Sequence, residues 1–175
     1  MWVRSKNIWR DWIFPLIVAV VLALTIRTFV AEARYINSES MVPTLNVNDR
    51  VFVDKIFYRL QGIERQDVII FMPPPQAHTR DDYIKRVLGL PGDEVEIRDG
   101  LLYVNGEAVE ELYLAEPMEG NYGPVVVPEG HLFVLGDNRN NSSDSRAWGF
   151  VPLANVKGKA ILRFYPFERF GILGK

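Results

Sequence analysis

Residues 83–104 read YIKRVLGLPGDEVEIRDGLLYV, and three short runs within them are rich in β-branched, aliphatic and aromatic side chains. Gly, Pro and Asp separate the runs. Such runs between turn-forming residues indicate β-strands, here at 83–88, 94–97 and 101–104. The Asn105-Gly106 pair that follows is typical of a two-residue hairpin turn. This stretch therefore predicts neighbouring antiparallel strands.

The same pattern continues over the chain beyond residue 33. Further strands are predicted at residues 50–58, 67–72, 132–135 and 159–165. No other stretch of about eleven residues has helical periodicity. The proline-rich residues 73–78 and the Gly- and Pro-rich residues 115–131 are expected to be irregular connections. We expect a mainly β fold, with an all-β domain of many short, mostly antiparallel strands over residues 32–175.

Composition and charge exclude several functions. The 175 residues contain no cysteine, which rules out disulfides, thiolate metal sites and a cysteine nucleophile. Only His78 and His131 are available for a histidine-dependent triad or a zinc site, and we expect neither a metal nor a cofactor. The net charge of −2 argues against nucleic acid as a partner. The charge is uneven, with +3 on residues 1–34 and −5 on the remainder.

The N-terminal region has the pattern of a membrane segment. Residues 12–26 read WIFPLIVAVVLALTI, and the run continues to residue 31 with Arg27 as its one charge. Because about 20 apolar residues span the hydrocarbon layer, we predict a tail at 1–11, a single transmembrane helix at 12–31 and a body outside the cytoplasm. The basic residues before the span place the tail in the cytoplasm. A buried core helix and a cleavable signal peptide ending at Ala31-Glu32-Ala33 are the alternatives.

Serine and lysine are the candidate catalytic residues. Ser38 and Ser40 alternate in a short extended stretch, which puts both hydroxyls on one side of the chain. A pair of serines beside a turn is otherwise ordinary turn chemistry. Lys85 lies among apolar neighbours, where lost solvation lowers a lysine pKa towards ~7–8 and lets the neutral amine accept a serine proton. The alternatives are a lysine that extends to water and a histidine base, His78 or His131.

Three segments together resemble the signature boxes of the type I signal peptidases, a family of membrane-bound Ser–Lys proteases. Residues 38–45 (SESMVPTL) resemble the nucleophile box, residues 83–93 (YIKRVLGLPGD) the lysine box, and residues 136–152 (GDNRNNSSDSRAWGFVP) the third signature. The boxes follow one another in the family's order, behind an N-terminal apolar segment.

The resemblance implies a role for each matching residue. Ser40 becomes the nucleophile, Lys85 the general base, and Ser38 the hydroxyl that forms an oxyanion hole with the Ser40 backbone N–H. The supporting residues implied are a serine that orients the lysine (Ser142), a charged pair (Asp144 and Arg146), two residues that hold the loop in place (Asp137 and Arg139), and the lining of the shallow substrate pockets (Ile36, Ile84 and Met41).

Two features depart from the family pattern. Asn140 stands where an aspartate is common, which weakens a charge-based role at this position. The connection between the second and third boxes is short, so we expect the cap region, about residues 94–131, to be little more than a hairpin.

The resemblance implies an endopeptidase that cleaves exported preproteins after A-x-A-like sites. The expected partners are signal peptides, bound in extended form, and the lipid bilayer. We expect the chain in the plasma membrane, with the thylakoid membrane as an alternative. Two other functions are considered: a self-cleaving Ser–Lys domain of the SOS-repressor type and a membrane-tethered β-domain without activity.

Overall fold

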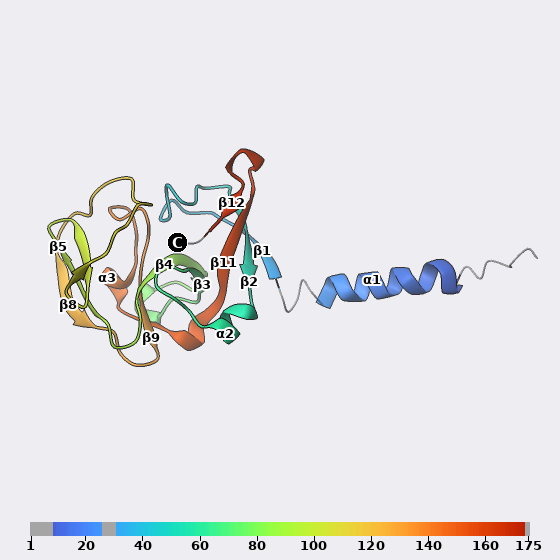
Figure 1. The fold of residues 1–175 in the computed structure, drawn as a ribbon, viewed down its shortest axis with the longest axis horizontal. Helices are drawn as coiled ribbons and strands as arrows, with labels where there is room; N and C mark the ends of the chain where they lie inside the picture. The colour runs from blue at the N-terminus through green and yellow to red at the C-terminus, as the bar shows by residue number, and fades with distance from the viewer. Residues whose placement is uncertain (1–8, 26–30, 174–175) are drawn as a thin grey trace, which may run out of the picture.

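The computed structural model describes residues 9–25 and 31–173. A π-helical segment, η1 (Trp9–Ile13), leads into α1 (Phe14–Thr25), and Figure 1 shows α1 standing apart from the β-sheets. Within the described ranges, no helix combines the length and the apolar character needed to cross a bilayer. Of the predicted span 12–31, residues 26–30 lie outside the described residues, and Ala31 belongs to a strand instead.

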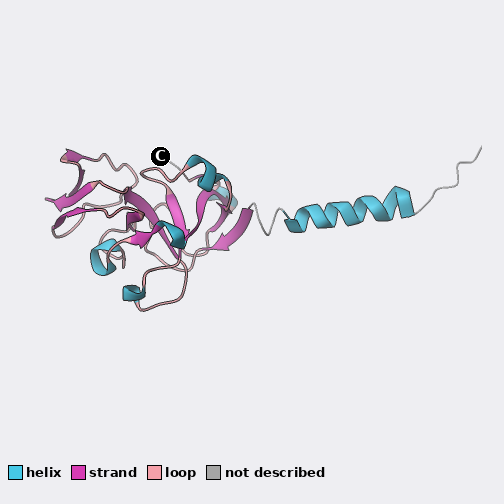
Figure 2. Ribbon diagram, turned by 90° about the horizontal axis from the view of Figure 1, so that it is seen from below, coloured by secondary structure: helices cyan, strands magenta, loops and turns pink. Residues whose placement is uncertain are grey.

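Two sheets form the β domain, and all their strand pairs are antiparallel (Figure 2). The larger sheet has the order β1-β2-β11-β3-β4-β9-β10, with β12 paired to β11. Its strands are β1 (Ala31–Tyr35), β2 (Arg50–Asp54), β3 (Val68–Phe71), β4 (Tyr83–Gly89), β9 (His131–Leu135), β10 (Val151–Pro152), β11 (Val156–Tyr165) and β12 (Gly171–Ile172). The smaller sheet has the order β7-β6-β5-β8. Its strands are β5 (Glu94–Arg98), β6 (Leu101–Val104), β7 (Glu107–Ala108) and β8 (Tyr122–Val126).

The remaining elements are short. They are the helices α2 (Phe57–Gln61) and α3 (Ser145–Trp148), and the 3₁₀ turns η3 (Pro75–Ala77), η4 (Leu153–Asn155) and η5 (Phe167–Arg169). The prediction of a mainly β fold with antiparallel strands is confirmed.

The strand predicted at 50–58 is wrong in its second half. Strand β2 ends at Asp54, whose carboxylate accepts hydrogen bonds from the next backbone N–H groups, those of residues 56, 57 and 58, at 3.0, 2.9 and 2.8 Å. These bonds satisfy donors that have no partner at the start of a helix. Helix α2 therefore begins where the apolar sequence alone suggests a continuing strand.

Strands β1 and β8 escape sequence prediction, as do the two-residue strands β10 and β12. The sequence of β1 has no β-branched residue, and the strand forms by pairing along its whole length with β2, with Ala31 opposite Asp54. Strand β8 contains Gly123-Pro124, but it lies at the edge of the smaller sheet, where a residue without an N–H is tolerated. The segment 115–131 thus contains a strand, and the cap region is a four-stranded sheet rather than a hairpin.

Apolar side chains of β4 belong to different core clusters. One cluster under the larger sheet includes Met41 and Leu45, with Ile84 of β4 packed against it. Another joins the two sheets, with Leu88 of β4 packed among residues of the smaller sheet such as Val95. Because β4 also lies between β3 and β9, its side chains have well-defined positions.

Candidate active site

The larger sheet brings Ser40 and Lys85 together. Ser40 lies in the turn that follows β1, and Lys85 is the third residue of β4. Lys85 Nζ donates a hydrogen bond to Ser40 Oγ at 2.5 Å. Both residues are buried, with 8% of Ser40 and 4% of Lys85 exposed. The predicted nucleophile and base are therefore in direct contact.

Burial makes the amine of Lys85 easier to deprotonate. Desolvation lowers the pKa of its amine from 10.5 to about 8, although the carboxylates of Asp144 and Asp137 act in the opposite direction. On the same strand face, Nζ lies 5.3 Å from the centre of the Tyr83 ring. A neutral fraction of the amine is therefore present near neutral pH, and it can accept a proton.

Ser38 lies at the mouth of the site beside the nucleophile. Its Oγ is 3.2 Å from Ser40 Oγ, as the alternation of the two residues predicts. The turn between them is held by Asn138, whose backbone N–H donates to the Ser40 carbonyl at 3.0 Å and whose side chain donates to the Glu39 carbonyl at 3.1 Å. No local sequence pattern marks Asn138 as a positioning residue.

Gly136 allows the loop that carries Ser142 to lie against the nucleophile turn. A Cβ atom at this position would collide with Ser142 Oγ and with the Ser40 carbonyl oxygen. The Gly136 N–H donates to a carboxylate oxygen of Asp144 at 3.1 Å, which fixes the loop at this approach. The sequence signal was present, because a glycine opens the third signature.

The hydrogen bond expected between Ser142 and Lys85 is not formed in the structure. Ser142 Oγ is buried and has no hydrogen-bond partner among the described residues. The Lys85 amine is directed at Ser40 Oγ instead. Ser142 remains next to the site, because Gly136 brings its hydroxyl close to the Ser40 carbonyl.

Asp144 and Arg146 form an ion pair beside the site. Arg146 donates to the two Asp144 oxygens through Nε at 2.9 Å and Nη2 at 2.8 Å. Asp144 is fully buried and caps α3 by accepting the Arg146 backbone N–H. Arg146 also donates to the Arg139 carbonyl, so the pair ties both ends of the loop together.

Asp137 and Arg139 hold the loop through partners that no local sequence pattern reveals. Arg86 donates two hydrogen bonds to Asp137, at 2.8 and 2.6 Å, and both side chains are almost fully buried. Arg139 donates two hydrogen bonds to Glu111, at 2.9 and 2.6 Å. The Tyr113 ring lies 3.8 Å from the Arg86 guanidinium carbon, and its hydroxyl donates to Glu111. The segment after β7 is thus anchored to the catalytic loop.

Asn140 contacts the same connecting segment and none of the catalytic side chains. Its amide donates to Glu116 at 3.0 Å and to the Pro117 carbonyl at 3.2 Å. Its side-chain oxygen accepts the Glu119 backbone N–H at 2.9 Å. The uncharged amide makes all three contacts. This is consistent with an asparagine at the position where an aspartate is common in the family.

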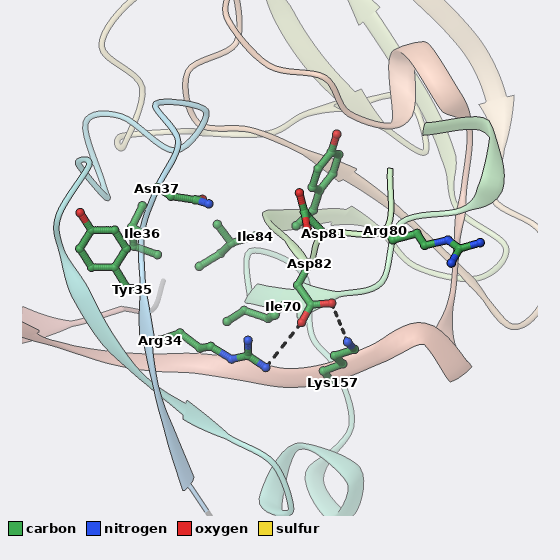
Figure 3. A pocket seen from close by; sticks show the side chains of 11 residues that line it. Arg34, Tyr35, Ile36, Asn37, Ile70, Arg80, Asp81, Asp82, Ile84 and Lys157 are labelled. Atoms are coloured by element: carbon green, nitrogen blue, oxygen red, sulfur yellow. Dashed lines mark hydrogen bonds and ion pairs between the residues drawn. The ribbon is translucent and has the colours of Figure 1, made fainter. Parts of the chain in front are cut away.

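Two adjoining cavities form a groove along the site. The first, of about 360 Å³, contains Ser38, Ser40, Ile84 and Lys85. The second, of about 430 Å³, shares Ile84 with it and adds Ile36 (Figure 3). The groove therefore has apolar side chains next to the nucleophile, and the two isoleucines predicted for the substrate pockets line it.

Met41 and the two histidines lie elsewhere. Met41 is fully buried in the core with Leu45 and is not among the residues that line the groove, because its apolar side chain packs beneath the nucleophile turn. His78 ends the turn η3 and His131 hydrogen-bonds the Glu129 carbonyl. Neither histidine lines the groove around Ser40.

A serine hydroxyl in contact with a desolvated lysine defines a class of serine hydrolases in which an amine replaces histidine as the base. Within this class, the comparisons with known proteins identify the family. The model of the family "Signal peptidase, peptidase S26" matches residues 9–165. The chain belongs to this signal peptidase family.

Curated relatives and a solved structure agree with this assignment. The "Probable signal peptidase I-2" of Synechocystis sp. is 50% identical over 171 residues, which cover 96% of this chain and 78% of that protein. The "Thylakoidal processing peptidase 1, chloroplastic" of Arabidopsis thaliana is 41% identical over 85% of this chain and 46% of that protein. A signal peptidase I from Enterococcus faecalis V583, known from a crystal structure, is 39% identical in sequence to this chain. The two structures match with a TM-score of 0.50, and the match covers 56% of this chain and 96% of that chain.

Proposed function

We propose that this protein is a serine endopeptidase that removes signal peptides from exported preproteins, with Ser40 as nucleophile and Lys85 as general base. The observation that carries the proposal is the 2.5 Å contact between Lys85 Nζ and Ser40 Oγ in a buried setting. Membership in the signal peptidase family supplies the class of substrate.

In the first step the neutral Lys85 amine takes the Ser40 hydroxyl proton while Oγ attacks the carbonyl carbon of the substrate residue at −1. The negative charge that develops on the carbonyl oxygen is stabilised by hydrogen bonds from the Ser38 hydroxyl and the Ser40 backbone N–H. Lys85, now an ammonium, gives its proton to the leaving amine as the peptide bond breaks. The product is an ester between Ser40 and the signal peptide.

In the second step water hydrolyses this ester. Lys85, neutral again, takes a proton from the water that attacks the ester carbonyl, and returns it to Ser40 Oγ as the ester bond breaks. Other residues hold the site without touching the substrate. Asp144 and Arg146 fix the loop beside Lys85, and Gly136 lets the Ser142 hydroxyl lie against the nucleophile turn. Ser142 is the residue proposed to orient the amine during these proton transfers.

The groove favours an extended substrate with small side chains. Strand β1 is an edge strand of the larger sheet, so its free side can pair with an extended peptide. Alternate side chains of such a peptide face the same wall. The residues at −1 and −3 then point towards Ile36 and Ile84, and larger side chains than alanine clash there.

We also propose that the N-terminal segment anchors the protein in a membrane, with residues 1–11 in the cytoplasm and the β domain outside. The run from Trp12 to Ile26 is uncharged and continues towards Ala31, where β1 begins. The apolar side chains of α1 are exposed along its length, as at Val21 and Leu22, each 57% exposed. The membrane is the plasma membrane or the thylakoid membrane.

Cleavage of a purified preprotein by the detergent-solubilised full chain tests the proposed activity. We expect cleavage in trans after an A-x-A site, identified by N-terminal sequencing, and none with Ser40→Ala. Self-cleavage alone, at a rate independent of protein concentration, would instead identify the repressor-type domain. No cleavage of any kind by a folded protein would support the inactive β-domain.

Extraction of membranes with alkaline carbonate tests the anchor. We expect the full chain to remain in the pellet, and external protease to digest the β domain in right-side-out vesicles. A soluble form beginning at Arg34 would show that the segment is a cleaved signal peptide.

A further inference from the structure

The groove continues beyond its apolar part and ends in charged side chains. The cavity of about 430 Å³, which does not include Ser40, is lined by Ile70, Arg34 and Lys157, and by Asp82, which also lines the Ser40 cavity. Figure 3 shows Arg34 and Lys157 meeting the carboxylate of Asp82. No part of the proposed reaction uses these three charges.

The three side chains come from different elements and form one ion cluster. Arg34 belongs to β1, Asp82 directly precedes β4, and Lys157 belongs to β11. Arg34 Nη2 lies 3.5 Å from Asp82 Oδ2, and Lys157 Nζ donates to Asp82 Oδ1 at 2.6 Å. Arg34 Nε also pairs with Glu32 at 2.9 Å.

The groups of this cluster that can still form hydrogen bonds are donors. Each Asp82 oxygen already faces a cation, and only 18% of this side chain is exposed. The Arg34 and Lys157 side chains are 37% and 47% exposed, and each has more N–H groups than its ion pairs use. A molecule in the groove therefore meets free N–H groups of Arg34 and Lys157 at this end, and the exposed Arg80 and Asp81 line the same cavity.

The spacing of the residues indicates which part of a substrate reaches the cluster. On the β1 side, Ser38, Ile36 and Arg34 alternate along the chain, and Ile84 and Asp82 alternate on the opposite wall. An extended peptide advances about 6.6–6.8 Å for every two residues. With the −1 and −3 side chains beside the isoleucines, the next side chain on the same face is that of −5.

We propose that Arg34, Asp82 and Lys157 form a subsite for the −5 residue of the preprotein, which takes a side chain with an acceptor oxygen and disfavours a cationic one. The proposal rests on the proposed function and deepens it. Glutamate, aspartate, glutamine or asparagine at −5 accepts hydrogen bonds from Arg34 and Lys157, whereas lysine or arginine meets like charge.

A series of preproteins that differ only at −5 tests the subsite. With alanine kept at −1 and −3, we expect the full chain in detergent to have a roughly two- to fivefold higher kcat/KM for glutamate than for lysine at −5, the size of an exposed ion pair. Lys157→Glu should reverse this preference, and the milder Lys157→Gln should reduce it. Higher ionic strength should weaken the preference of the wild type.

The controls separate a local subsite from the overall charge. Arg98→Glu makes the same change of net charge on the smaller sheet and should keep the wild-type preference. Charge changes at −4, whose side chain points away from the wall, should have no effect. Equal preferences at −4 and −5, or a preference that Lys157→Glu and Lys157→Gln leave unchanged, would overturn the subsite. If the alanine substrate is not cleaved in a Ser40-dependent way, the proposed function fails as well.

Discussion

Two consecutive buried cations on opposite faces of β4, Lys85 and Arg86, have different partners. Lys85 and Arg86 are 4% and 1% exposed. Lys85 contacts a serine hydroxyl and, among the described residues, takes part in no ion pair, and its pKa falls to about 8. Arg86 instead donates two hydrogen bonds to the buried carboxylate of Asp137. A lysine that is buried without a directly bound carboxylate thus loses its proton more easily, which is what the proposed general base requires.

The largest expected effect comes from replacing the base. Lys85→Arg keeps a positive charge but cannot lose its proton, and Lys85→Met has no amine, so both should lower kcat by about 10²–10⁴-fold or more. Cleavage assays beside Ser40→Ala, with circular dichroism to show folding, provide the measurement. Rapid turnover by the folded arginine variant would remove Lys85 as the base and return His78 or His131 to consideration.

The pH dependence sharpens the same comparison. Only the neutral amine accepts the Ser40 proton, so the cleavage rate should rise with pH and level off above about 8. Because the pKa of folded Lys85 lies below its unfolded value of 10.5, the folded state binds fewer protons between these values, and stability should rise with pH there. Lys85→Met should lack this rise. A wild-type rate that falls across pH 8 would contradict the assignment.

On the other face, removing the carboxylate should destabilise the fold. Asp137→Asn leaves the Arg86 guanidinium buried without its counter-charge, which costs about 3–5 kcal/mol of unfolding free energy. Urea denaturation of the full chain measures this loss. The double variant Arg86→Met, Asp137→Leu removes both charges and should recover much of it. If Asp137→Asn is as stable as the wild type, the ion pair does not hold the loop.

The Ser38→Ala variant tests the site around Lys85 without changing any charge there. The variant loses one donor to the developing oxyanion, and such losses lower kcat by about 10²–10³-fold. We expect KM and the thermal midpoint to change little, because Ser38 lies at the groove surface. Kinetics that separate kcat from KM provide the test, and wild-type kcat would make the oxyanion assignment wrong.

The smallest effect concerns the ring that covers Arg86. Tyr113→Phe keeps the stacking on the guanidinium but loses the hydrogen bond to Glu111, a loss of about 1 kcal/mol. Tyr113→Leu also loses the cation–π contact and should cost about 1–2 kcal/mol more. Thermal unfolding ranks the two variants. Equal midpoints for both would show that the stacking contributes nothing.

Sequence prediction succeeded where local pattern and tertiary structure agree. The strand at 101–104 was predicted with the bounds that β6 has, because alternating burial and an Asn-Gly turn specify it locally. Ser40 and Lys85 were singled out as side chains with the right chemistry. The choice between a catalytic and an ordinary lysine rested on the family resemblance, because solvation depends on residues far away in the chain.

The missed elements depend on distant partners. Strand β1 has little intrinsic preference for its conformation and forms because β2 pairs with it. The partners of Asp137 and Arg139 are Arg86 and Glu111, which lie 51 and 28 residues away in sequence. No periodicity within a short window contains such information.

By itself the sequence determined the β class of the body, the apolar N-terminal segment and the candidate serine and lysine side chains. These follow from local patterns, from composition and from the motifs. Tertiary structure alone decided which buried cation meets a hydroxyl and which meets a carboxylate, and how closely Gly136 lets Ser142 approach Ser40. The physical reason is that desolvation, ion pairing and close packing depend on distances between segments that only the folded sheets bring together.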